Sequence, residues 1–87
     1  MISNEWAQLL GRKGVPQIIE SLAHGSQRPK NLLEISSVSR PGFYAILKEM
    51  LELKLVRPTM IVQNNRGYQA YEFTSDGYVF AEHIIKK

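Results

Sequence analysis

The sequence contains no cysteine, which excludes a disulfide framework and a thiolate metal site. No apolar run approaches the roughly 18 residues of a membrane-spanning helix, and the first residues lack the apolar segment of a secretory signal peptide. These absences predict a cytoplasmic protein that does not contact a membrane. Its 87 residues are expected to form a single domain, residues 1–87, around one modest core.

Patterns typical of catalysis are missing as well. The segment "GRKG" has neither the spacing nor the preceding strand of a phosphate-binding loop. His24 and His83 lie far apart in the sequence and outside any metal-binding pattern, and no nucleophile has an identifiable base. Glu49 and Glu52 are expected to be solvated on a helix flank. The sequence therefore predicts a protein that is not an enzyme and binds neither metal nor cofactor.

The charged residues show a modest excess of positive charge. Eleven Lys and Arg residues against eight Asp and Glu residues give a net charge of +3. This excess favours an anionic partner without identifying one, because many basic proteins bind no nucleic acid. The positions of the charges along the predicted elements are therefore more informative than their sum.

Apolar spacing and capping residues predict a mainly helical α+β chain. Leu32 and Ile35 are expected to face inward from the third helix, and Ser39 is a suitable N-cap for the fourth. After the fourth helix, "PTMIV" and "YQAYEF" flank the turn-forming run "QNNRG", which predicts a hairpin with its tip at 64–67. The expected helices cover 4–10, about 15–24, 29–35 and about 39–53, followed by the hairpin at about 57–73 and a last helix at 77–85.

The fourth helix is expected to have two faces of different character. Phe43, Ile46, Leu47 and Met50 fall at the spacing of a buried helical stripe. The opposite face then carries three polar or aromatic side chains at four-residue intervals, namely Arg40, Tyr44 and Lys48. Such a face is usually no more than a solvated surface. Placed between a helix-turn break and a hairpin, it instead indicates contact with DNA.

The run from "LLGRKGVPQIIESLAHG" through "LKEMLELKLVRPT" to "YEFTSDG" resembles the winged helix-turn-helix transcriptional regulators, in particular the HxlR, MarR, PadR and ArsR groups. Leu47, Met50, Leu55 and Val56 fill the apolar positions where the recognition helix enters the wing. In the return strand, "YEFTSDG" matches the family pattern. Lys54 departs from the family, which usually has glycine there, and a left-handed lysine would cost about 1 kcal/mol.

The resemblance implies a prokaryotic, sequence-specific regulator of transcription that binds double-stranded DNA. Its recognition helix, about 39–53, would enter the major groove, and its wing, about 57–73, would contact the backbone or minor groove. Gly42 either lets the backbone approach DNA or relieves crowding beside Pro41. The alternative function is a winged-helix module that binds another protein. The residues expected to contact DNA are Arg28, Lys30, Ser39, Arg40, Gly42, Tyr44, Lys48, Arg57, Asn65 and Arg66.

The two terminal helices, at about 3–10 and 76–86, carry more apolar residues than one buried stripe requires. This surplus predicts a homodimer, although packing of the two helices on each other in a monomer would also use it. A small-molecule effector remains open, because aromatic residues such as Trp6, Tyr71 and Phe80 either line a pocket or fill the core. The expected dimer residues are Trp6, Leu9, Leu10, Tyr78, Phe80, Ala81, Ile84 and Ile85.

Overall fold

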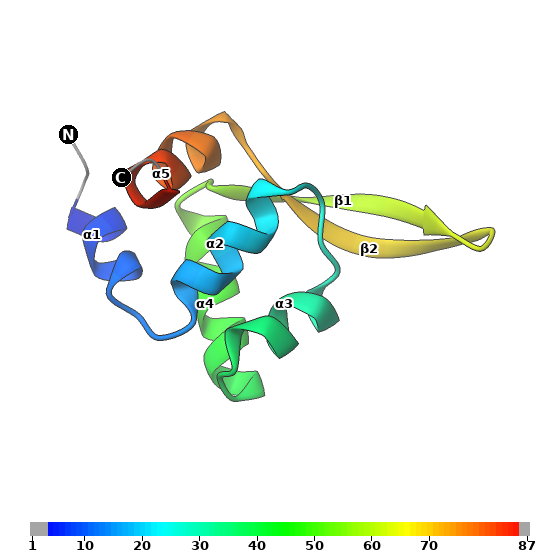
Figure 1. The fold of residues 1–87 in the computed structure, drawn as a ribbon, viewed down its shortest axis with the longest axis horizontal. Helices are drawn as coiled ribbons and strands as arrows, with labels where there is room; N and C mark the ends of the chain where they lie inside the picture. The colour runs from blue at the N-terminus through cyan, green and yellow to red at the C-terminus, as the bar shows by residue number, and fades with distance from the viewer. Residues whose placement is uncertain (1–3, 86–87) are drawn as a thin grey trace.

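The computed structural model describes residues 4–85, with side chains for residues 4–83. Figure 1 shows helices and one antiparallel hairpin in the predicted order, which confirms the α+β winged helix-turn-helix architecture. None of the helices within 4–85 has the length and apolar character needed to cross a bilayer. The elements are α1 (Asn4–Leu10), α2 (Val15–Ala23), α3 (Pro29–Ser36), α4 (Arg40–Glu52), β1 (Val56–Gln63), β2 (Arg66–Phe73) and α5 (Ser75–Ile85).

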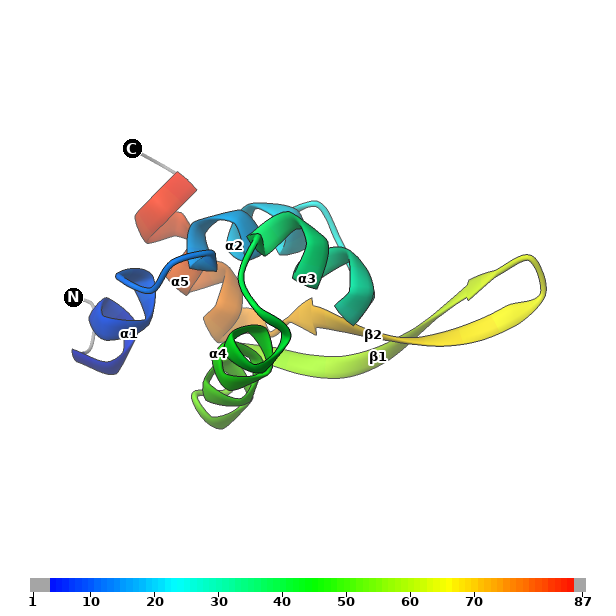
Figure 2. The same cartoon turned by 90° about the horizontal axis from the view of Figure 1, so that it is seen from below.

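The helices form a compact body from which the hairpin projects. In Figures 1 and 2 the hairpin extends along the longest axis, while α1 and α5 lie at the end of the molecule away from its tip. The molecule measures 42 × 27 × 23 Å along its principal axes. The hairpin tip is thus remote from α1 and α5. The base of the hairpin and α4 adjoin them, since Arg57 lines one hollow with Tyr78 and Lys48 lines another with Glu5.

A single core joins all the helices to the base of the hairpin. The predicted inward face of α4 is confirmed, because Phe43, Ile46, Leu47 and Met50 are each at most 5% exposed. The stripe forms because residues at this spacing lie on one side of a helix. The other buried members of the core are Leu9, Val15, Ile18, Ile19, Leu22, Leu32, Leu55, Val56, Phe73, Phe80 and Ala81.

The prediction that Ile35 faces inward is wrong, since its side chain is 46% exposed. Leu32 and Ser36, one helical turn apart, are buried instead. The small Ser36 suits this position because a Cβ atom on Gly14 would lie only 3.0 Å from the Ser36 carbonyl oxygen. The backbone of α3 therefore approaches the start of α2 closely, and this contact determines which side of α3 faces the core.

The end of α4 keeps the geometry of a glycine cap although lysine occupies the position. Lys54 has φ of 60°, in the left-handed region. The Leu55 amide donates to the Met50 carbonyl at 2.9 Å, and the Lys54 amide donates to the Leu51 carbonyl at 3.0 Å. These two bonds form a Schellman motif, which places the fully buried Leu55 beside Met50. Lys54 thus adopts the backbone conformation that glycine would have at this position. The left-handed lysine lowers the stability of the fold by about 1 kcal/mol relative to glycine.

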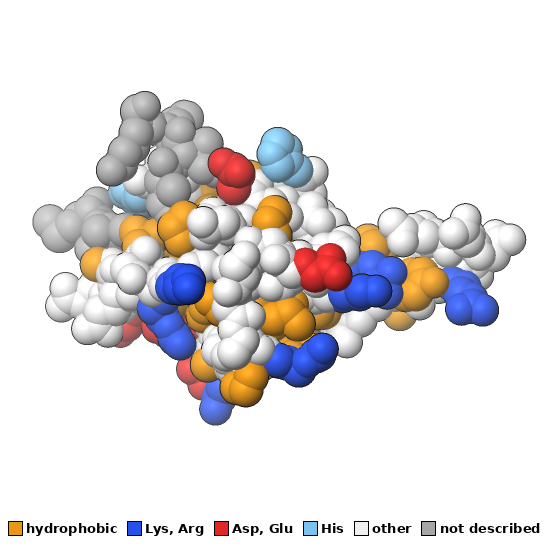
Figure 3. All heavy atoms as spheres, turned by 60° about the horizontal axis from the view of Figure 1, so that its bottom comes forward, with side chains coloured by type: hydrophobic (Ala, Val, Ile, Leu, Met, Phe, Trp, Pro, Cys, Tyr) orange, Lys and Arg blue, Asp and Glu red, His pale blue; other side chains and the backbone are white. Residues whose placement is uncertain are grey.

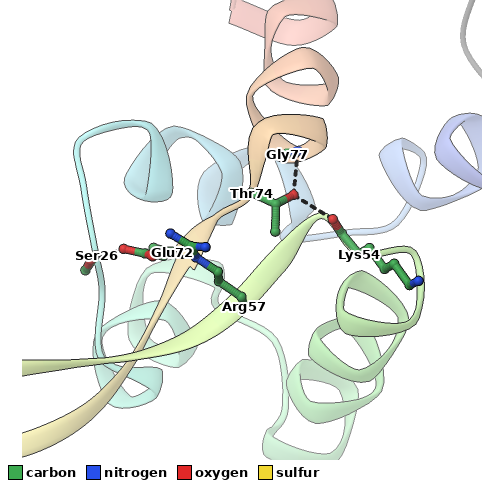
Figure 4. Close-up of polar contacts among 6 residues, drawn as sticks. All are labelled: Ser26, Lys54, Arg57, Glu72, Thr74 and Gly77. Carbon is green, nitrogen blue, oxygen red and sulfur yellow. Dashed lines mark hydrogen bonds and ion pairs between the residues drawn. The ribbon is translucent and has the colours of Figure 1, made fainter.

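Thr74 connects the end of α4, the base of the hairpin and the start of α5 (Figure 4). Its hydroxyl donates to the Lys54 carbonyl at 2.6 Å and accepts from the Gly77 amide at 3.1 Å. Its own amide donates to the Leu55 carbonyl at 3.0 Å. Thr74 is thus the N-cap of α5, which begins at Ser75, two residues before the predicted start.

The hairpin is a regular ladder closed by a two-residue turn. Val56 pairs with Phe73 at its base and Gln63 with Arg66 at its end, so the turn contains only Asn64 and Asn65. Both asparagines have positive φ, 52° and 65°, as a type I′ turn requires. The predicted tip at 64–67 is therefore shorter than expected, and Arg66 and Gly67 belong to β2.

We expect Gly77→Ala to lower the thermal stability of the protein. Alanine normally stabilises a helix relative to glycine by about 1 kcal/mol, but a Cβ atom here would overlap the Leu55 carbonyl oxygen and meet the Phe73 ring. Thermal unfolding followed by circular dichroism measures the effect. Gly11→Ala is the control, since its Cβ meets nothing closer than 3.6 Å. An unchanged or raised Tm for Gly77→Ala would contradict this account of the junction.

Candidate nucleic-acid interface

The outward side of α4 is open to solvent. Arg40 and Lys48 are exposed, and Tyr44 is 47% exposed with its ring edge-on to Phe43, 5.1 Å between centroids. Because Phe43 is buried, this contact rests one side of the tyrosine ring on the core. The three side chains therefore form an exposed row along a helix whose opposite side anchors it. At one end of the row, Lys48 lines a hollow together with Glu5 of α1 and with Glu49 and Glu52.

The start of α4 is fixed by its cap and by the turn before it. The Ser39 hydroxyl accepts a hydrogen bond from the Gly42 amide at 3.2 Å, as predicted for an N-cap. Ser37 ends α3 with a left-handed conformation, φ 59°. Pro41 lies in the first turn of α4, where a missing amide proton costs no helical bond. These features fix where α4 begins after the turn that ends α3.

Gly42 lies at a crowded point of the same cap. A Cβ atom at this position would lie 3.1 Å from the Ser39 hydroxyl oxygen and 3.9 Å from the Val38 Cβ. The short distance to Ser39 favours the interpretation that Gly42 relieves local crowding. Close approach of the α4 backbone to DNA stays a prediction.

Two of the basic residues predicted to bind DNA lie at the start of α3. Arg28 is the N-cap residue, in an extended conformation, and Lys30 is exposed in the first turn. The guanidinium carbon of Arg28 lies 3.9 Å from the centre of the Tyr68 ring, which belongs to the hairpin. Lys30 is therefore free to reach a phosphate, whereas Arg28 is stacked on an aromatic ring.

Of the two basic residues of the hairpin, Arg57 is engaged by another side chain and Arg66 is not paired with a carboxylate in the described chain. The Arg57 Nε donates to Glu72 at 2.6 Å, and the Ser26 hydroxyl donates to the other carboxylate oxygen at 3.3 Å (Figure 4). Arg57 is thus partly neutralised. Arg66 and Asn65 are exposed at the outer end of the hairpin, and Arg66 has no carboxylate partner among the described residues. Arg66 is therefore the stronger candidate for a contact with DNA.

Figure 3 shows Lys and Arg side chains spread over the face that runs from the helical body onto the hairpin. Glu49, expected to be solvated, instead accepts from Arg12 Nη1 at 2.7 Å. This surface ion pair joins the α1–α2 loop to α4 and contributes at most about 1 kcal/mol. The positive charge of Arg12 also partly neutralises the Glu49 carboxylate, which lies next to Lys48 in the sequence of α4. Glu52 is exposed near the far end of α4, as predicted.

The residues predicted for a dimer interface fall into two groups. Leu9, Phe80 and Ala81 are at most 4% exposed in the chain's own core, and this packing accounts for them without a partner subunit. They are therefore removed from the predicted dimer surface. Trp6 is half-buried, edge-on to Phe80 with 5.3 Å between ring centroids.

The remaining residues leave a smaller apolar surface on α5. Leu10 is partly buried against the core, while Tyr78 is 51% exposed. Val79, which the sequence did not single out, is 48% exposed. The side chains of Ile84 and Ile85 lie outside the described residues. A dimer through α1 and α5 stays a prediction.

A hollow of about 490 Å³ lies where the hairpin base meets α5. The aromatic residues considered for an effector pocket belong to the core: Phe80 is buried there, and Trp6 and Tyr71 are partly buried against it. The hollow is lined instead by Lys54, Arg57, Phe73, Thr74, Ser75, Asp76 and Tyr78.

The contact between Gln27 and the hairpin was missed from sequence. Each of Gln27 and Tyr71 donates its backbone amide to the other's carbonyl at 2.9 Å. One signal for an extended segment was present, because Arg28 precedes Pro29 and the residue before proline is biased towards extended backbone. Nothing in the local pattern indicated that the segment pairs with β2.

No family model and no curated protein matches the sequence. Solved structures do match it. A protein from Enterococcus faecalis V583, described as a regulator of the MarR family, has a TM-score of 0.75 at 18% identity, covering 95% of this chain and 76% of that one. Diamide-treated YodB from B. subtilis has a TM-score of 0.67 at 27% identity, covering 87% and 79%.

The transcriptional repressor BigR from Xylella fastidiosa has a TM-score of 0.67 at 17% identity, covering 92% of this chain and 78% of that one. These likenesses establish the winged helix-turn-helix fold.

Proposed function

We propose that this chain is a sequence-specific regulator of transcription that binds double-stranded DNA. The observation that carries the proposal is the two-sided α4, with Phe43, Ile46, Leu47 and Met50 buried and Arg40, Tyr44 and Lys48 exposed. A helix of this kind fits the major groove. The winged fold shared with MarR-family and repressor structures supports the same function.

Each exposed residue of α4 has a separate role in this proposal. Arg40 lies in the first turn, the part of a recognition helix that usually reaches base edges, and can donate to guanine through two hydrogen bonds. Tyr44, one turn further, contacts a phosphate or a thymine methyl. Lys48 lies another turn along and contacts the backbone. Lys30 at the start of α3 and Arg66 at the outer end of the hairpin contact phosphates.

The second candidate is a winged-helix module that binds another protein through the same face. An apolar α4 surface would favour it. The exposed large hydrophobic residues lie elsewhere, at Ile35 on α3, Met60 and Val62 on β1, and Tyr78 and Val79 on α5, with Tyr44 alone on α4. The exposed face of α4 therefore favours DNA over an apolar protein partner.

We expect Arg40→Ala to weaken the preference for the site that the wild-type chain selects from a random duplex pool, because specificity is relaxed at the base pair that Arg40 contacts. Loss of a bidentate base contact costs about 1–3 kcal/mol, or roughly 5- to 150-fold in affinity for that site. Lys54→Gln is the matched control, since it removes the same charge from the opposite end of α4. Wild-type binding that neither selects a site nor falls with salt would overturn the proposed function.

We expect Arg66→Ala to weaken binding about equally on selected and random duplexes. The slope of log K against log salt should become shallower by about one, because a phosphate contact releases roughly one counterion. Fluorescence anisotropy over a salt series measures this slope. Gln63→Ala is the control, because Gln63 is the cross-strand partner of Arg66 and carries no charge. An unchanged slope for Arg66→Ala would remove it from the interface.

The chain is further proposed to act as a homodimer through α1 and α5. The half-exposed Tyr78 and Val79 support this, together with the position of both helices away from the hairpin tip (Figure 1). A twofold dimer would place two α4 helices one DNA turn, about 34 Å, apart on a near-palindromic site.

Light scattering at micromolar concentration is expected to give twice the chain mass, and Val79→Glu is expected to shift the species to the monomer. A charge at that position would have to be desolvated in the interface. Met60→Glu serves as the control, since Met60 is 70% exposed on the hairpin. A monomeric wild-type chain at this concentration would exclude the dimer.

A further inference from the structure

We propose that Arg28 is a positioning residue that sets the direction of the hairpin relative to α4 by stacking on Tyr68. The inference rests on the proposed function and assigns Arg28 a role other than the phosphate contact expected from sequence. In this role it determines which flanking base pairs the wing reaches. The stack joins the residue that begins α3 to the outer half of β2.

The contact lies beside an isolated bridge on the free edge of β2. Gln27 and Tyr71 exchange two backbone hydrogen bonds of 2.9 Å in an antiparallel bridge. Continued by one residue in each direction, this register places Ser26 opposite Glu72 and Arg28 opposite Ala70. The Ser26 hydroxyl does contact the Glu72 carboxylate, at 3.3 Å, as this register requires.

The same register explains how the arginine reaches Tyr68. In an antiparallel pair, residues offset by two are diagonal neighbours on one face, within reach of long and aromatic side chains. Tyr68 is the diagonal neighbour of Arg28, two residues from Ala70. Ala70 is small and fully buried, so its side chain does not block the path. The guanidinium carbon consequently lies 3.9 Å from the centre of the Tyr68 ring.

The hairpin is attached at two points, the bridge at Tyr71 and the stack at Tyr68. Two points fix its direction, whereas a single point would let it pivot. Tyr68 lies three residues closer to the tip than Tyr71, a distance of about 10 Å along a strand. Beyond the backbone bonds of Tyr71 the hairpin is a two-stranded ribbon, which has little stability by itself. The stack therefore restrains the hairpin at the point where its own pairing is least able to do so.

The inner attachment is also joined to the helical body. The side-chain amide of Gln27 donates to the Ser21 carbonyl of α2 at 3.1 Å. The Arg28 carbonyl accepts from the amides of Asn31 and Leu32, at 3.0 and 3.1 Å, and so begins α3. α3 in turn contacts α4 across the helix-turn-helix. The stack therefore connects Tyr68 to α4 through Arg28 and α3.

Arginine is suited to this task and lysine is not. A planar guanidinium stacks on an aromatic face and leaves its N–H groups at the edge, whereas an ammonium group acts as a point charge. Phenylalanine in place of Tyr68 keeps the ring face, and leucine removes it while keeping an apolar side chain. Tyr68→Phe keeps the stacking face and Tyr68→Leu removes it. Arg28→Lys keeps the charge without the planar group, and Arg28→Ala removes both.

The first measurement uses the free protein and does not depend on DNA. Residual dipolar couplings of backbone amides report the direction of the hairpin relative to the helices. We expect Arg28→Ala and Tyr68→Leu each to reduce the couplings of the outer hairpin while those of the helices persist, and Tyr68→Phe to retain wild-type values. Wild-type couplings in both Arg28→Ala and Tyr68→Leu would overturn the proposal.

The second measurement uses the duplex selected by the wild-type chain. Hydroxyl-radical footprints of Tyr68→Leu are expected to lose protection on the flanks reached by the hairpin while keeping the central protection from α4. Affinity should fall about two- to fivefold, the size of an exposed cation–π contact. The double substitution Arg28→Ala with Tyr68→Leu should weaken binding no more than Arg28→Ala alone, because the two residues act as one unit.

The outcomes distinguish this inference from the proposed function. Full flanking protection in Tyr68→Leu, with a loss only in Arg28→Ala, would show a plain phosphate contact and overturn positioning by the stack. If the wild-type chain binds no duplex but the couplings change as expected, the proposed function fails and the stack still directs the hairpin. A loss in Tyr68→Leu that Tyr68→Phe shares would point to the hydroxyl and also overturn the proposal.

Discussion

The arrangement of α4, the hairpin and α5 depends on one side chain, Thr74. Its hydroxyl uses both of its hydrogen-bonding capacities, as a donor to the Lys54 carbonyl and as the cap of α5 through the Gly77 amide. The absence of a side chain at Gly77 lets the first turn of α5 pack directly against the Leu55 carbonyl. Three elements with different directions therefore meet within a few residues, and the base of the hairpin is joined there to the end of α4 and the start of α5.

A domain of this size has to use its helices for more than one purpose. The apolar row of α4 provides a large share of the core, and the opposite row is exposed, with only the Tyr44 ring in contact with the buried Phe43. The hairpin has no core of its own along most of its length, as shown by Met60 and Val62, which are 70% and 74% exposed. Its order comes from contacts at its base and along one edge, so the segment proposed to contact DNA is also the one with few contacts to the core.

The sequence was sufficient for the features that depend on local pattern. The two faces of α4 follow from its spacing, and the N-cap at Ser39 follows from residue type. Prediction failed where distant segments decide the outcome. Ile35 is exposed because the approach of Gly14 to Ser36 sets the face of α3, and the bridge between Gln27 and Tyr71 joins segments whose pairing no periodicity reveals. The surplus of apolar residues in α5 was partly explained by the core itself, since Phe80 and Ala81 are buried there.

The tight turn at Asn64 and Asn65 restricts how the hairpin of such a protein can change in length. Strand residues alternate between the two faces, so a single inserted residue in β2 between Tyr68 and Tyr71 would move Arg66 and Tyr68 to the opposite side. Two residues added to each strand would keep the parity and carry the tip outward by nearly 7 Å. Related chains with longer or shorter wings should therefore differ by even numbers of residues per strand, so that their reach changes in discrete steps.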